Sequence, residues 1–468
     1  MSKLTEHPEG SAKELWKISF PLMISSLATM SMLFVDRLFL AHYSLGALNA
    51  SVNASNLAWV FSGGLGMLTA MSEVFVARYN GAGLNSKIGP AVWQMLWIAL
   101  FSFALFLPLA FQLGPRFFSA HSFCRLEQDY FLIAMLFGPA YPLLTALSGF
   151  FVGRGQTRIL IILAFLGNLL NVLLDRLFIF GFPGWVPEMG IKGAAIATSI
   201  GSLFQVAVLF CLFLKKNQRE KFQTAKPALN LQLLKLCLKI GLPQGLFYSV
   251  EVLGWSFFFF LMTDLGEGYI TISAVCQSLI LLFSFFLDGL SRGVTAIAGN
   301  FLGAKKIDRI AFLLKSGLKL QLAFSLFTAF FFIFQPRWLL EPLFALEAFG
   351  GRLNFDLTFR FCLFCTSLYL FFEGLRWVLA GFLTAAGDTL FLMLSGAFSV
   401  WIFFLLPVYL SIVLKAQKIE LAWLLAAAYA ALLCLVYFLR FKKGKWKALD
   451  LLDRKKAYSE IEQNQELP

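Results

Sequence analysis

The chain has 468 residues, of which 59% are hydrophobic and only 14% are charged. An average soluble domain carries about 25% charged residues, so this chain has too little polar surface for a water-soluble fold. A membrane span needs about 20 mostly apolar residues, and roughly a dozen such runs follow one another, separated by short loops. The composition therefore predicts an all-α polytopic membrane protein. It excludes an independent catalytic domain, so we expect no enzyme activity.

Apolar runs between charged residues or Gly/Pro breaks predict twelve transmembrane helices. In chain order they cover residues 15–40, 52–79, 91–113, 127–151, 158–181, 191–214, 236–263, 270–301, 310–334, 357–384, 389–413 and 420–440. The longest basic, polar interruption, Lys215 to Asn230, separates the sixth run from the seventh and is the expected connection between two lobes. The predicted domains are an N-terminal segment (1–14), an N-lobe (15–214), an inter-lobe linker (215–234), a C-lobe (235–440) and a C-terminal tail (441–468).

The net charge of +13 indicates membrane topology rather than nucleic-acid binding. If both termini are cytoplasmic, the cytoplasmic segments up to Lys447 hold 23 Lys and Arg residues and the opposite loops hold 8. This bias follows the positive-inside rule, and basic residues on that side face anionic lipid. We therefore expect a multi-pass protein of the plasma (inner) membrane, with both termini cytoplasmic and no nucleic-acid partner.

The cysteines do not indicate a redox or metal centre. The chain has seven cysteines, an odd number, and most lie inside apolar runs. Cys362 and Cys365 form a CxxC at helical spacing in a Phe-rich run, where packing on one helix face is the favoured interpretation. No resident metal or cofactor is expected.

Internal repeats are the most informative feature of the sequence. Three segments recur in the same order: 17–21 as 239–243, 79–82 as 301–304, and 149–157 as 381–389. The first two matches share an offset of 222 residues and the third has an offset of 232. These matches indicate a parallel duplication of a six-helix unit. The alternative is that similar hairpins acquired the same Gly and Pro positions by convergence. A parallel duplication predicts two six-helix bundles (6+6) around a central cavity, which is a transporter architecture. The sequence has no GxxxxGK[ST] phosphate loop, so energy would come from a gradient or another chain.

Several short motifs also carry a family resemblance. They are Val35-Asp36, Asn171 four residues before Asp175, Lys192 to Thr198, the Gly-Ala pair ending the second helix, and Gly381 to Thr389. In this order they resemble the MATE (multidrug and toxic compound extrusion) family, NorM-like branch of the MOP flippase/exporter superfamily, over nearly the whole chain. The resemblance implies a two-lobed, V-shaped, twelve-helix exporter driven by inward Na⁺ or H⁺.

Four oxygen-bearing side chains form a candidate cation site in the N-lobe: Asp36, Asn171, Asp175 and Thr198. Asn171 and Asp175 lie on one helix face at i and i+4, and hard cations such as Na⁺ prefer oxygen ligands. In the family that the chain resembles, the matched positions line a cation site. The alternative is a structural lock, in which Asp36 and Asp175 pair with Arg176 and Arg37 across the two helices.

The C-lobe contains candidate coupling residues. Glu251 lies in the middle of the seventh span with no basic residue within four positions, and Glu373 lies sixteen residues before Thr389. Both positions match acids of the NorM-like branch. An intramembrane carboxyl is a functional candidate by default, and we expect Glu251 to be an unpaired carboxyl that takes up a proton or a cation during alternating access. The alternative for Glu251 is a neutral side chain, hydrogen-bonded within the helix packing. Structural ion pairs along one helix are expected for Glu373 with Arg376 and for Asp288 with Arg292.

These features favour secondary efflux transport. Phenylalanine, with 55 residues, would supply large apolar walls, and a few acids would suit amphipathic organic cations. Glu73 and Arg78, at the end of the second helix, are expected at an interface or gate. We expect small organic molecules as substrates, Na⁺ or H⁺ as the transported coupling ion, and a monomer in the lipid bilayer. The coupling ion and the physiological substrate stay open.

A related alternative is a flippase for lipid-linked saccharides. It is favoured if four arginines face the cavity and meet pyrophosphate; these are Arg37, Arg176, Arg292 and Arg376. That class usually has more than twelve helices.

Overall fold

The computed structural model describes residues 4–119, 123–336, 357–414, 418–449 and 451. The predicted C-terminal tail beyond residue 451 lies outside the described residues, as do the loop charges Arg337, Arg352 and Lys415.

Helices account for nearly all of the described chain, and twelve of them are long and apolar enough to cross a membrane. The first half contains α1 (Ala12–Tyr43), α2 (Leu45–Ala70), α3 (Ser72–Ala82), η1 (Asn85–Lys87), α4 (Ile88–Phe101), α5 (Phe103–Pro108), η2 (Leu109–Leu113), α6 (Gly114–Phe117), α7 (Cys124–Leu136), α8 (Ala140–Val152), α9 (Arg158–Phe180), α10 (Ile191–Phe213) and α11 (Lys216–Phe222). The second half contains α12 (Leu231–Leu265), α13 (Glu267–Gly303), α14 (Asp308–Ala329), η3 (Phe330–Phe334), α16 (Leu357–Ala386), α17 (Thr389–Ser399), η5 (Val400–Leu405), α18 (Leu406–Val408), η6 (Tyr409–Val413), α19 (Ile419–Lys442) and η7 (Lys445–Ala448).

Some membrane spans consist of more than one helical piece. The third span, Asn85–Phe117, includes a π-helical turn directly after Pro108, and the eleventh, Thr389–Ile412, has π-helical turns on both sides of Pro407. Proline removes a backbone hydrogen bond and distorts the turn that precedes it. The short helix α11 lies within the segment predicted as a linker, and α12 begins at Leu231 rather than at residue 235.

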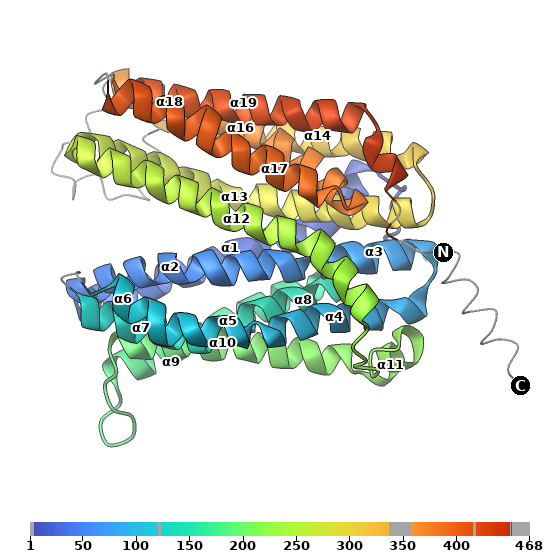
Figure 1. Cartoon of the computed structure of the whole chain (residues 1–468), viewed down its shortest axis with the longest axis horizontal. Helices are drawn as coiled ribbons and strands as arrows, with labels where there is room; N and C mark the ends of the chain where they lie inside the picture. Colours follow the sequence, from blue (N-terminus) through green and yellow to red (C-terminus); the bar gives the residue numbers. More distant parts are fainter. Residues whose placement is uncertain (1–3, 120–122, 337–356, 415–417, 450, 452–468) are drawn as a thin grey trace, which may run out of the picture.

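The two halves of the chain form two helical bundles that lie side by side (Figure 1). We call α1 to α11 the N-lobe and α12 to α19 the C-lobe. Helix α1 contacts α13, α2 contacts α12, and α3 contacts α13. The start of α1 and the helix α11 lie at the same end of the molecule, which we call the N-terminal face, and the opposite end is the far face. The predicted fold class, two duplicated six-helix bundles in a membrane protein, is confirmed.

The repeats meet each other at the crossing of α3 and α13. A Cβ atom on Gly81 would lie 2.1 Å from the backbone oxygen of Asn300, and one on Gly303 would lie 2.2 Å from that of Arg78. Residues 81 and 303 are 222 positions apart, as are 78 and 300, so the crossing follows the internal repeat. Only glycine allows two backbones to approach this closely.

Polar contacts join the lobes from the N-terminal face to about mid-depth. They include Lys306 to Glu9 (2.6 Å), Asn80 to Asn300 (2.7 Å), Arg78 to the carbonyl of Ala385 (2.9 Å), Ser26 to Asp288 (2.6 Å) and Trp59 to Tyr248 (2.5 Å). Arg78 therefore lies at an inter-lobe interface, as predicted.

Candidate functional site

The four predicted N-lobe residues come together toward the far face, where α1, α9 and α10 meet. The hydroxyl of Thr198 on α10 donates to Oδ2 of Asp36 on α1 at 2.8 Å. The amide nitrogen of Asn171 donates to the Thr198 oxygen at 3.4 Å. The carboxyl groups of Asp36 and Asp175 are near enough to interact electrostatically. Helical spacing places Asn171 and Asp175 one turn apart on the same face of α9.

This cluster is rich in oxygen atoms that accept no hydrogen bond from any described residue. Four such oxygen atoms are buried: Oδ1 of Asp36, Oδ1 of Asn171 and both carboxylate oxygens of Asp175. Buried acceptors normally have a partner, and two neighbouring carboxylates repel each other unless a proton or a cation lies between them. The atoms available to bind a cation here are all oxygens, which suits Na⁺ or a shared proton as the transported ion.

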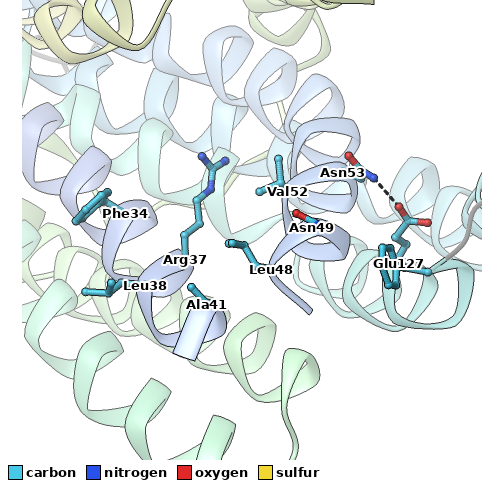
Figure 2. A pocket seen from close by; sticks show the side chains of 10 residues that line it. Phe34, Arg37, Leu38, Ala41, Leu48, Asn49, Val52, Asn53 and Glu127 are labelled. Atoms are coloured by element: carbon cyan, nitrogen blue, oxygen red, sulfur yellow. Dashed lines mark hydrogen bonds between the residues drawn. The ribbon is translucent and has the colours of Figure 1, made fainter. Parts of the chain in front are cut away.

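The arginines that follow the two aspartates point elsewhere. Arg176 is exposed, and its guanidinium carbon lies 4.9 Å from the centroid of the Phe180 ring. Arg37 is exposed and points into the space between α1 and α2 (Figure 2). Among the described residues, neither arginine forms an ion pair with Asp36 or Asp175 within 4.0 Å. The geometry therefore gives the lock no support.

A cavity of about 930 Å³ lies beside α1 and α2, two of the N-lobe helices that pack against the C-lobe. Phe34, Arg37 and Leu48 are among its lining residues (Figure 2). Asn53 on α2 also lines it and donates to Oε1 of Glu127 on α7 at 2.8 Å. Sequence reasoning missed Asn53 and Glu127, because nothing along the chain indicates that α2 and α7 meet here.

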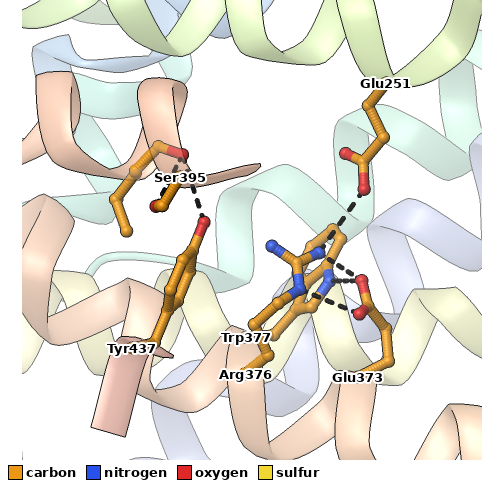
Figure 3. A network of polar contacts seen from close by, with 7 residues as sticks. Glu251, Glu373, Arg376, Trp377, Ser395 and Tyr437 are labelled. Carbon is orange, nitrogen blue, oxygen red and sulfur yellow. Dashed lines mark hydrogen bonds and ion pairs between the residues drawn. The ribbon is translucent and has the colours of Figure 1, made fainter. Parts of the chain in front are cut away.

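A second acidic network lies halfway along the C-lobe spans (Figure 3). Arg376 on α16 forms two hydrogen bonds to Glu373, one of them at 2.8 Å, and the indole nitrogen of Trp377 donates to Glu373 at 2.7 Å. Glu251 on α12 reaches the same guanidinium, with Oε1 at 3.6 Å from Nη2 of Arg376. The expected pair of Glu373 with Arg376 is present.

Two predictions about partners are corrected by the structure. Glu251 is not isolated, because Arg376 reaches it from a different helix. Arg292 lies 3.2 Å from Oε2 of Glu73 in the N-lobe, rather than within 4.0 Å of Asp288. Asp288 instead accepts a hydrogen bond from Ser26 at 2.6 Å. In each case the sequence spacing predicts neighbours one turn away on the same helix. It does not predict which other helix packs alongside, so the partner on that helix could not be predicted.

Glu73 and Arg292 connect the lobes. Glu73 is buried on α3 and Arg292 lies on α13, so their ion pair crosses the inter-lobe contact. Asp288 lies one turn before Arg292 and also bonds across the lobes. The prediction that Glu73 belongs to an interface or gate agrees with this geometry.

The duplicated lobes and the buried acidic clusters define a two-lobed membrane transporter fold. The MatE family model matches residues 21–177 and 247–410. This chain therefore belongs to the MatE family, as its sequence motifs predicted.

Individual relatives agree with this assignment. The chain is 26% identical over 456 residues to the probable multidrug resistance protein NorM of Thermotoga maritima, covering 95% of each chain. It is 28% identical over 322 residues to the multidrug resistance protein NorM of Vibrio cholerae, covering 67% of this chain and 69% of the relative.

Solved structures show the same fold. A MATE protein in complex with MaL6 superposes with a TM-score of 0.78 at 16% identity, over 94% of this chain and 97% of that one. A multidrug resistance MATE family transporter of the MOP superfamily, in an outward-facing conformation, superposes with a TM-score of 0.74 at 17% identity, over 95% and 98% of the two chains.

Proposed function

We propose that this protein is a cation-coupled antiporter that exports amphipathic organic cations by alternating access of its two lobes. It acts in the plasma (inner) membrane with both termini in the cytoplasm. The names of its relatives, which are multidrug resistance proteins, support the export of drug-like compounds.

The observation that carries the proposal is the sharing of Arg376 by Glu251 and Glu373. When both carboxylates are ionised, the three side chains carry one net negative charge in a buried site. A proton, Na⁺ or an organic cation would each neutralise that charge, so the coupling ion and the substrate compete for it. Competition of this kind is what an antiporter requires, because each ligand must displace the other.

The location of Glu251 connects this competition to lobe movement. Glu251 lies on α12, the C-lobe helix that packs against α2 of the N-lobe. Two hydrogen bonds join neighbouring α12 residues to α2: Ser249 donates to the carbonyl of Val60 at 2.9 Å, and Tyr248 accepts from the Trp59 indole at 2.5 Å. A change of charge at Glu251 therefore acts one turn from the inter-lobe contact.

The N-lobe cluster supplies a second cation position. Asp36 and Asp175 have buried oxygens without protein donors, so Na⁺ or H⁺ bound there would relieve their repulsion. The cavity of about 930 Å³ falls in the range of small-molecule sites.

The structure favours export of organic compounds over the flipping of lipid-linked saccharides. A pyrophosphate site would need several arginines facing the cavity. Arg292 and Arg376 are bound to carboxylates, Arg176 covers Phe180, and Arg37 is the one of these four that lines the cavity among the described residues.

The test is transport by the purified protein in liposomes loaded with a fluorescent organic cation, with Na⁺ and pH gradients imposed separately. One gradient should drive substrate movement against its concentration difference. Glu251→Gln should abolish coupled transport while preserving expression, and Asp264→Asn, which changes an exposed acid on the same helix, should behave as wild type. Equal coupled transport by wild type and Glu251→Gln would refute the proposal.

A further inference from the structure

A second cavity, of about 390 Å³, lies at the N-terminal face of the N-lobe, and no residue of either acidic cluster lines it. Its walls come from Leu4 and Thr5, the start of α1, the loop between α8 and α9, the end of α10 and the residues that lead into α11. We call it the basic pocket, because three cationic side chains line it: Lys17, Arg158 and Lys215.

No acidic residue is among the described residues that line the basic pocket. Glu6 bonds to Lys17 and is the acidic partner nearest to it. The Glu6 side chain is 66% exposed, and its hydrogen bond to Lys17 lowers the pKa of Glu6. Exposed ion pairs of this kind contribute little free energy, so Lys17 is available to a stronger anionic ligand.

A buried arginine orients two further donors around this pocket. Arg154 is only 8% exposed. It donates to the side-chain oxygens of Gln218 and Gln156, at 2.9 Å each, and to the carbonyl of Phe150 at 2.9 Å. Its guanidinium carbon lies 3.7 Å from the centroid of the Phe150 ring and 4.6 Å from that of the Phe222 ring.

These bonds fix which end of each glutamine remains for a ligand. Because Arg154 occupies the carboxamide oxygens, Gln156 and Gln218 offer their NH₂ groups, which are pure donors. Helix α9 begins at Arg158 with no side-chain cap on its first turn, so its first backbone N–H groups add positive potential. The basic pocket therefore combines three cations with several hydrogen-bond donors, which is the chemistry of a phosphate site.

The surface beside the pocket favours a lipid over a soluble anion. Leu4, Phe151 and Leu212 contribute apolar walls. From exposed Arg158, the exposed face of α9 continues toward the far face through apolar side chains at helical spacing: Ile162, Phe165, Leu166, Leu169 and Leu173. An anionic head group held at Arg158 would thus have its acyl chains directed along an apolar helix face in the bilayer.

We propose that the basic pocket binds the phosphodiester head group of an anionic phospholipid. The bound lipid would connect the N-terminal segment to α9 and α10 and would stabilise the N-lobe at the membrane surface. This inference does not depend on transport, so its failure would leave the proposed function untouched.

The test uses the full-length protein in a neutral detergent. Thermal unfolding is followed while phosphatidylglycerol or phosphatidylcholine is added in mixed micelles, and native mass spectrometry counts bound lipids. Phosphatidylglycerol should raise the unfolding temperature of wild type and phosphatidylcholine should not. The double variant Arg158→Gln with Lys215→Gln, in which both native side chains are exposed, should bind phosphatidylglycerol at least tenfold more weakly.

A matched control carries the same loss of charge elsewhere on the N-terminal face. Lys442→Gln with Lys443→Gln changes two exposed lysines at the end of α19 and should respond to phosphatidylglycerol as wild type does. An equal loss in the control, or an unchanged response in the Arg158 and Lys215 variant, would overturn the proposal. An equal rise with inorganic phosphate alone would also overturn it, since the occupant would then be a soluble anion.

Discussion

At the scale of single residues, the C-lobe network depends on one guanidinium between two carboxylates. Arg376 bonds to Glu373 and lies 3.6 Å from Glu251. Its side chain is only 4% exposed, so little water screens the three charges and each affects the others more strongly than at the surface. Removing the arginine would leave two buried acids without a cation.

We predict that Arg376→Met lowers the stability of the protein by about 3–5 kcal/mol, the usual cost of stranding a buried charge. Adding Glu373→Gln should restore part of the loss, because one of the two uncompensated carboxylates disappears. Thermal unfolding of the purified variants measures both effects. Arg309→Met is the control, since Arg309 is 50% exposed and pairs with exposed Asp308, and it should change stability by less than about 1 kcal/mol. If Arg376→Met unfolded at the same temperature as wild type, the charge of Arg376 would not stabilise the network.

In the N-lobe cluster, we expect that replacing a buried acid does not destabilise the protein, in contrast to replacing Arg376 in the C-lobe. Asp175 has no arginine partner among the described residues, and both its carboxylate oxygens lack a donor. We predict that Asp175→Asn folds with the stability of wild type, within about 1 kcal/mol, and loses any stabilisation by Na⁺. Unfolding temperatures in NaCl and in choline chloride at equal ionic strength provide the measurement.

The control for this prediction is Arg37→Leu, combined with Asp175→Asn. Because Arg37 points into the space between α1 and α2 (Figure 2) and, among the described residues, forms no ion pair with Asp175, it should not alter the effect of Asp175→Asn. A large loss of stability in Asp175→Asn that Arg37→Leu rescues would restore the ion-pair lock.

The sequence predicted the candidate residues of both acidic clusters, but it did not predict all of their partners. The spacing of Asn171 and Asp175 on one helix face follows from helical geometry, and the link to Asp36 came from the family resemblance. The structure brings these residues together, while their binding of a cation stays a prediction. Glu251, by contrast, was expected to lack a basic neighbour, because Arg376 lies 125 residues further along the chain.

At the scale of helices, apolar runs locate the spans but not their ends. The second span was expected at 52–79 and covers Leu45–Ala82. Its early residues include Asn49, which lines the cavity of about 930 Å³. A hydrophobicity criterion stops at such polar residues, although a membrane helix tolerates them where they face a cavity.

The crossing of α3 and α13 permits a test at the same scale. We predict that Gly81→Ala and Gly303→Ala each destabilise this arrangement of the lobes by about 1–3 kcal/mol, because the new methyl group would overlap a backbone oxygen. Gly268→Ala, near the start of α13, has open space around its Cβ position and should leave stability unchanged or slightly higher. Thermal unfolding of the three purified variants checks this, and equal stabilities would mean that the lobes do not meet as described.

At the scale of the whole molecule, the internal repeat correctly predicted two duplicated helical bundles. It could not predict how the bundles are held together. That depends on pairs such as Glu73 with Arg292 and Ser26 with Asp288, whose members are more than 200 residues apart. These bonds lie between the N-terminal face and mid-depth, so they must break if the lobes separate at that face.

In the proposed mechanism, cation binding at the shared Arg376 network moves the lobes. Spin labels at Ser86 and Asp308, on the two lobes beside the crossing of α3 and α13, would report the separation of the N-terminal face by double electron–electron resonance. The native cysteines would first be replaced. In wild type, the label distance should shift between two values when the pH is lowered or Na⁺ is added. In Glu251→Gln the distance should be the same under all these conditions. A wild-type distance that never changes, or a Glu251→Gln variant that shifts as wild type does, would rule out this mechanism.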